Sequence, residues 1–99
     1  MSKTQRFRIY VETVDEAEVL WVKSSTSAYF ESFTICQHVG YWKGKEEKTT
    51  VVELINVEEG DDYFAAFTVR VKALAQVLKV ELNQEKVLVV EDEVEASLV

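Results

Sequence analysis

The chain contains one histidine, His38, and one cysteine, Cys36, two positions apart. Residues two apart on a strand point to the same side, so these two side chains are expected to share a face. No serine of the chain has the surroundings of a nucleophile elbow, which argues against a Ser-His-Asp hydrolase. Two potential ligands are too few for a metal site within one chain. We therefore predict no hydrolase chemistry, no metal and no cofactor.

Aromatic and basic side chains gather in the segment GYWKGKEEK, residues 40–48. Tyr41 and Trp42 offer flat faces on which an adenine could stack, and Lys43 and Lys45 could meet the phosphates of a nucleotide. These four residues are our candidates for ligand binding. The alternative is that the aromatic pair packs in a subunit interface, where such residues are also enriched.

Charge limits the partners of this protein. Asp and Glu outnumber Lys and Arg by 18 to 11, which gives a net charge of −7 and would repel a nucleic-acid backbone. A single cysteine allows no internal disulfide, which fits a reducing compartment. The N-terminal residues alternate between charged and apolar types, unlike a signal peptide or a membrane span. We therefore expect a cytoplasmic protein that binds neither nucleic acid nor membrane.

The 99 residues suffice for one core, so we predict a single domain over residues 1–99. Residues 6–13 alternate between apolar and polar, as a half-buried strand does. Residues 33–39 and about 47–57 predict two further strands, and residues 86–90 predict a buried fourth one. Gly40 and Gly44 mark a hairpin turn over residues 40–44, longer than a tight turn. Residues 94–99 are a candidate for a short extra strand.

Two helices are expected between these strands. Asp15 can cap the first, but the polar run of residues 23–27 leaves open whether that helix continues to Phe30. The second begins after Gly60 and Asp61 and ends near Asn83 and Gln84. Its apolar residues recur at steps of three and four: Phe64, Phe67, Val71, Leu74, Ala75, Leu78 and Leu82.

The element order β-α-β-β-α-β predicts an α+β, ferredoxin-like fold, with an antiparallel four-stranded sheet and two helices on one face. The other face of the sheet would then be uncovered. Tyr10, Trp42, Val52 and Leu54 are candidates for an apolar surface there, because the third strand is hydrophobic on both sides. Oligomerisation through the sheet is the simplest way to cover it.

The segment GYWKGKEEKTTVVELI, residues 40–55, resembles the corresponding hairpin of PII-like and CutA-like proteins. Those families are ferredoxin-like trimers with ligand clefts between neighbouring subunits. The resemblance implies a homotrimer whose small-molecule ligand binds in such clefts.

A second resemblance covers residues 40–99: EEKT, residues 46–49, and QEKVLVV, residues 84–90, are similar to stretches of phage S-adenosylmethionine lyases, although the hairpin here is shorter. It implies that Glu46 or Glu47 holds the cationic substrate, that Tyr41 donates its hydroxyl, and that Gln84 contributes to ligand binding. The alternative is that the two glutamates, with Lys45 and Lys48, form a solvated charged edge.

Three hypotheses about function result. The leading one is a PII-like trimer that senses or sequesters a nucleotide-type ligand between subunits. The second is an S-adenosylmethionine lyase that forms homoserine lactone and methylthioadenosine. The third is a structural or protein-interaction module without a ligand.

Overall fold

The computed structural model describes residues 3–57 and 61–96, apart from the side chains of Lys3, Trp42 and Asp61. Six elements follow one another in the predicted order. They are β1 (Lys3–Glu12), α1 (Glu16–Tyr29), β2 (Thr34–Trp42), β3 (Lys45–Asn56), α2 (Asp61–Glu81) and β4 (Leu88–Glu95). Neither helix in this part of the chain is long and apolar enough to cross a membrane.

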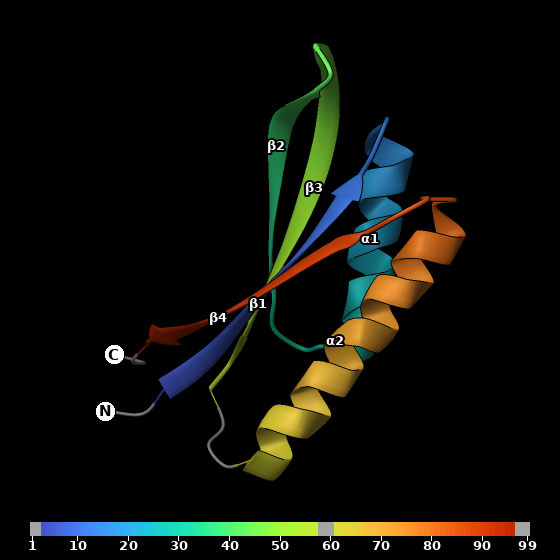
Figure 1. Cartoon of the computed structure of the whole chain (residues 1–99). Coiled ribbons are helices and arrows are strands. Elements are labelled where there is room, and N and C mark those ends of the chain that lie inside the picture. The colour runs from blue at the N-terminus through green and yellow to red at the C-terminus, as the bar shows by residue number, and fades with distance from the viewer. Residues whose placement is uncertain (1–2, 58–60, 97–99) are drawn as a thin grey trace.

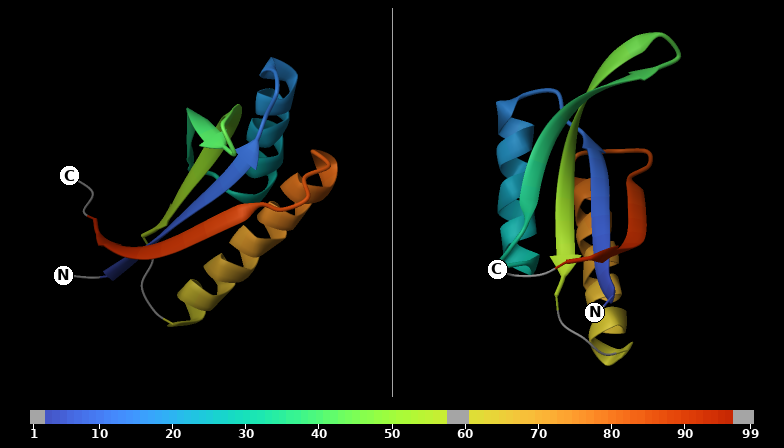
Figure 2. Two further views of the ribbon diagram at one scale, coloured as in Figure 1. Left: turned by 45° about the horizontal axis from the view of Figure 1, so that its top comes forward. Right: turned by 90° about the vertical axis from the view of Figure 1, so that its left-hand side faces the viewer.

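The four strands form one antiparallel sheet in the order β2-β3-β1-β4. Both helices lie on one side of it, and the hairpin of β2 and β3 projects beyond the rest of the sheet (Figures 1 and 2). This is the predicted α+β, ferredoxin-like arrangement. The other face of the sheet is bare in a single subunit, as expected.

Helix α1 runs without a break from Glu16 to Tyr29, and Phe30 is its C-cap. Asp15 caps its start by accepting the N–H of Glu18 at 2.9 Å. The polar run is helical, and its hydroxyls bond back to carbonyls one turn earlier: Thr26 donates to Val22 at 2.7 Å, and Ser27 to Lys23 at 2.9 Å. The helix therefore continues through this run to Tyr29, which settles the boundary that the sequence left open.

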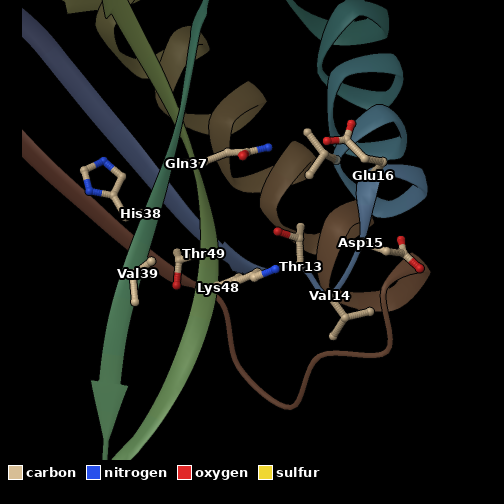
Figure 3. A pocket seen from close by; sticks show the side chains of 10 residues that line it. Thr13, Val14, Asp15, Glu16, Gln37, His38, Val39, Lys48 and Thr49 are labelled. Atoms are coloured by element: carbon tan, nitrogen blue, oxygen red, sulfur yellow. The ribbon is translucent and has the colours of Figure 1, made fainter.

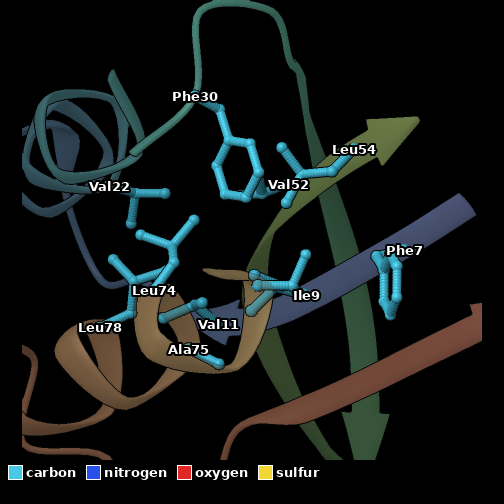
Figure 4. Close-up of a cluster of buried hydrophobic side chains, with 11 residues drawn as sticks. Phe7, Ile9, Val11, Val22, Phe30, Val52, Leu54, Leu74, Ala75 and Leu78 are labelled. Atoms are coloured by element: carbon cyan, nitrogen blue, oxygen red, sulfur yellow. The ribbon is translucent and has the colours of Figure 1, made fainter. Parts of the chain in front are cut away.

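Helix α2 supplies the side chains that cover the sheet. Val71, Leu74 and Leu78 are fully buried, as the three- and four-residue spacing predicted. Phe67 is half-buried, and its ring lies 5.7 Å from that of Phe7 and 5.2 Å from that of Phe30. The helix is followed by Asn83 in a left-handed conformation with φ 51°. Figure 4 shows the core between the helices and the sheet.

The prediction for the bare face was wrong at two positions. Val52 and Leu54 are fully buried against the helices, so they belong to the core and not to the second face. Their neighbours Val51, Glu53 and Ile55 alternate to the other side. Tyr10 does lie on the bare face, because it pairs with Val51 and is shifted by one position from the buried Ile9.

The fourth strand also differs from the prediction. It begins at Leu88 and continues to Glu95, so the start of the proposed extra strand is the end of β4, and residues 97–99 lie outside the described part. The strand is at the edge of the sheet and not buried: Leu88 is 59% exposed and Val90 38%. One face of β4 therefore adds apolar surface to the bare side of the sheet.

Two ion pairs cross this bare face. Arg6 donates two hydrogen bonds to the carboxylate of Asp92, and Arg8 donates to Glu53 at 2.9 Å. The hydrogen bond from Arg6 lowers the pKa of Asp92 below the usual range of an aspartate, and the two carboxylates raise the pKa values of the arginines. The surface is therefore a mixture of paired charges and apolar side chains.

Candidate functional site

A two-residue turn joins β2 to β3, shorter than the five-residue turn predicted. Lys43 and Gly44 form it, with φ values of 50° and 79°. Positive φ at both central positions is the geometry of the tight hairpin turn that follows the twist of antiparallel strands. Gly40 is therefore part of β2, and Tyr41 and Trp42 lie in its last two positions.

The tight turn fixes which candidate residues share a face of the hairpin. Tyr41 stands opposite Glu46, and Gly40 stands opposite Glu47. Because side chains alternate along a strand, Tyr41 and Glu46 lie on the face that the helices cover further along the sheet, and Glu47 lies on the other face. A single subunit thus brings Tyr41 together with Glu46 and not with Glu47.

The end of the hairpin is open to solvent. Tyr41 is 73% exposed, Lys43, Lys45 and Glu46 are exposed, and Glu47 is half-buried. Trp42 pairs with Lys45 through the backbone, but its side chain lies outside the described part. These residues can contact a ligand, yet they do not enclose one within their own subunit.

Gln84 stands apart from the other candidates. Its side-chain amide donates to the carbonyl of Glu12 at 3.2 Å and to that of Leu82 at 3.3 Å. It therefore joins the end of α2 to the end of β1. Glu12 pairs with Thr49, which places Gln84 near the base of the hairpin and away from its tip.

Cys36 and His38 are both exposed on β2, and they share the bare face of the sheet, as the alternation predicted. Across residues 3–57 and 61–96, no group of three or more side chains is arranged to hold a metal ion.

The sequence did not predict a cavity of about 570 Å³ at the base of the hairpin (Figure 3). Residues 13–15, which connect β1 to α1, form one wall together with Glu16 and Val19 of α1. Residues 37–39 of β2 and residues 48–49 of β3 form the other. None of the residues predicted to bind or react lies in it. The sequence had singled out one of the lining residues, Asp15, as a helix cap. The cavity itself forms only because the hairpin lies beside the start of α1, and local sequence does not indicate that packing.

No family model matches the chain, and no curated protein matches it. The solved structures include a phage S-adenosylmethionine lyase without ligand, with a TM-score of 0.70 and 20% identity over 90% of this chain and 79% of that one. A phage S-adenosylmethionine lyase in complex with S-methyl-5'-thioadenosine has a TM-score of 0.67 and 21% identity, over 91% and 81% of the two chains.

Two further structures match almost the whole chain. CPII, a nitrogen regulatory PII-like protein from Thiomonas intermedia bound to ADP, AMP and bicarbonate, has a TM-score of 0.61 and 9% identity over 99% of this chain and 97% of that one. CutA from Synechococcus elongatus has a TM-score of 0.55 and 16% identity, over 100% of this chain and 87% of that one.

The chain therefore shares its ferredoxin-like α+β fold with PII-like, CutA and phage lyase structures. At these identities the likeness concerns the fold alone, and it confirms the resemblance of the hairpin and of the element order to the PII-like, CutA-like and lyase structures. The hairpin candidates lie at the tip of the hairpin of β2 and β3, in the ends of both strands and in the turn between them, and the cavity lies at the base of this hairpin.

Proposed function

We propose that this protein is a homotrimer that binds a small molecule of the adenine-nucleoside type in the clefts between its subunits, and so senses or sequesters it. The observation that carries the proposal is the fold match over at least 90% of the chain to proteins solved with such ligands: methylthioadenosine in a phage lyase, and ADP and AMP in CPII. The homotrimer is what the resemblance of residues 40–55 to the PII-like and CutA-like hairpin implies.

The hairpin supports a site that needs a second subunit. Tyr41 presents an exposed ring suited to stacking on a base. Lys43 in the turn and Lys45 at the start of β3 are exposed at the same end of the hairpin. An exposed hairpin end binds weakly by itself, because a small-molecule site usually buries most of its ligand. A neighbouring subunit packed against the hairpin would supply the missing wall.

Thermal unfolding with ADP, AMP, methylthioadenosine and S-adenosylmethionine tests the proposal. A ligand at a hundred times its dissociation constant should stabilise the protein by about 2.7 kcal/mol. Tyr41→Ala should abolish the shift without changing the unliganded melting temperature. Tyr63→Ala, at a tyrosine 57% exposed on α2, is the matched control and should retain it. If none of the four compounds shifts unfolding of the wild type, the proposal fails and the structural-module hypothesis gains.

An S-adenosylmethionine lyase is the second candidate. Two observations favour it: the TM-scores of 0.70 and 0.67 to the phage lyases exceed the 0.61 to CPII, and a net charge of −7 suits a cationic sulfonium better than a polyphosphate. The substrate carboxylate would attack its own γ carbon, the bond from that carbon to sulfur would break, and the sulfur would leave with the electron pair as neutral methylthioadenosine. The lactone of homoserine is the other product.

Such a reaction needs no proton transfer, so the protein would act by folding the substrate into a reactive shape and excluding water. Proximity of this kind can supply about 7 to 11 kcal/mol of the barrier. Glu46 and Tyr41 share a face of the hairpin and are the pair suited to face the cationic substrate. Chromatography of S-adenosylmethionine after incubation with the protein separates the candidates, because a binder leaves it intact and a lyase releases methylthioadenosine.

A further inference from the structure

The cavity at the base of the hairpin is held in a fixed shape by backbone and buried hydroxyl contacts. The N–H of Thr13 donates to the carbonyl of Lys48 at 3.0 Å, and the hydroxyls of Thr13 and Thr50 share a hydrogen bond of 2.8 Å. On the helix side, the N–H of Val14 donates to the carboxylate of Glu18 at 2.7 Å. These bonds join the loop before α1 to both β3 and the helix, so the two walls cannot move apart independently.

The two walls carry opposite charges. The wall next to α1 contributes the carboxylates of Asp15 and Glu16, and the hairpin contributes the ammonium of Lys48 and the amide of Gln37. In Figure 3 the side chains of Lys48 and Gln37 extend from the hairpin toward the start of α1, whereas His38 points away. Asp15 uses one carboxylate oxygen to cap the helix, which leaves its second oxygen for another donor.

These polar groups are available to a ligand, and apolar surface lies between them. Within the described part of the chain, the side chains of Glu16, Lys48 and Gln37 form no hydrogen bond or ion pair. Val19 is buried in the same wall, while Val14 is 67% exposed and Val39 is 55% exposed beside the cavity. The volume of about 570 Å³ is within the usual range for small-ligand sites.

We propose that this cavity binds an α-amino acid, or a ligand that ends in one, with an apolar side chain. The ammonium would face Asp15 and Glu16, the carboxylate would face Lys48 and Gln37, and the side chain would lie on the three valines. A simple anion would meet two carboxylates, and a simple cation would meet Lys48, so only a zwitterion matches both walls.

The inference is independent of the nucleoside site proposed above. The two proposals meet in one ligand, because S-adenosylmethionine carries a zwitterionic methionyl end. They are separable with its two halves: methylthioadenosine lacks the amino acid, and L-methionine lacks the nucleoside. If methylthioadenosine binds and L-methionine does not, the amino-acid site is overturned and the nucleoside site stands. If L-methionine binds and methylthioadenosine does not, the nucleoside site is overturned and the amino-acid site stands.

The test is titration calorimetry of the full chain with L-methionine at millimolar concentration, beside L-methioninamide and N-acetyl-L-methionine. The amide lacks the carboxylate and the acetyl compound lacks the ammonium, so each loses its contacts with one wall. Both should bind about ten- to a hundredfold more weakly than L-methionine, the range for losing a hydrogen-bonded charge. No binding of L-methionine, or equal binding of all three, would overturn the proposal.

Variants then assign the walls. Lys48→Met should weaken L-methionine binding by about ten- to a hundredfold, and it should bind L-methionine no more tightly than the amide. Glu16→Gln should also weaken L-methionine binding, and it should reduce the affinity difference between L-methionine and N-acetyl-L-methionine. Lys23→Met on α1 and Glu31→Gln before β2 are exposed controls that should bind as the wild type does. Circular dichroism checks that all four fold. Wild-type affinity in both wall variants would contradict the assignment.

Discussion

Tyr41 stands directly opposite Glu46 in the ladder between β2 and β3, so their side chains share one face of the projecting hairpin. Directly opposite residues are the closest side-chain neighbours in an antiparallel pair. Glu47 follows in sequence but points to the other face. If the hairpin carries chemistry, Tyr41 and Glu46 should act as one unit and Glu47 should not belong to it.

The first prediction is a double-mutant cycle at the hairpin. Tyr41→Phe and Glu46→Gln should be non-additive in their effect on turnover of S-adenosylmethionine, or on binding of methylthioadenosine if there is no turnover, because contacting residues couple by about 0.5 to 3 kcal/mol. The effects of Tyr41→Phe and Glu47→Gln on the same measurement should instead be additive. A cycle in which Glu47 couples to Tyr41 as strongly as Glu46 does would place the two residues in one site across a subunit boundary.

The second prediction concerns stability. Leu74→Ala removes a fully buried side chain between α2 and the sheet, so it should lower the free energy of unfolding by about 2 to 5 kcal/mol. Val69→Ala, at a position 68% exposed on the same helix, should change it by at most about 0.5 kcal/mol. Urea denaturation measures both. Equal effects would mean that the helix packs with another face inward.

The third prediction separates folding from assembly. Light scattering at micromolar concentration should give the mass of a trimer. Leu88→Asp, at an exposed position on the bare face, should dissociate the trimer and leave a folded monomer, because it places an unpaired charge in an apolar contact. Leu54→Asp should unfold the chain, because Leu54 lies in the core. A monomeric wild type would refute the trimer.

The fourth prediction concerns the start of α1. Asp15→Ala removes the cap that accepts the N–H of Glu18 and should cost about 1 kcal/mol of stability. Asp15→Asn retains a good capping side chain and should cost less. Thermal unfolding of the two variants makes the comparison, and equal losses would show that charge near the helix dipole, not the cap, is what matters.

The fifth prediction is a pH dependence. Arg6 lowers the pKa of Asp92 in the folded protein, so the ion pair contributes stability above the usual aspartate pKa of about 3.9 and loses it as pH falls through the lowered value. The stability difference between wild type and Asp92→Asn should therefore be present at pH 7 and smaller near pH 2.5. A difference that is constant over this range would show that the pair contributes through packing alone.

Local periodicity determined most of the elements from the sequence. The alternation of Phe7, Ile9 and Val11 and the spacing of Val71, Leu74 and Leu78 identified the buried faces of β1 and α2 correctly. Asp15 was recognised as a helix cap because capping depends only on the next few residues. The element order then favoured the observed sheet topology, since few connections of six such elements are possible.

Only the tertiary structure decided which side of β3 is buried and where the cavity lies. Residues 51–52 are adjacent valines, so the sequence offers no alternation, and the pairing of Val52 with Ile9 fixes the inward face. The tight turn depends on a left-handed lysine, which the residue type does not reveal. The cavity exists because the carbonyl of Lys48 accepts a hydrogen bond from the N–H of Thr13, which lies 35 positions earlier in the chain. Contacts of that kind depend on strand register and on how elements pack, and a local pattern of residues specifies neither.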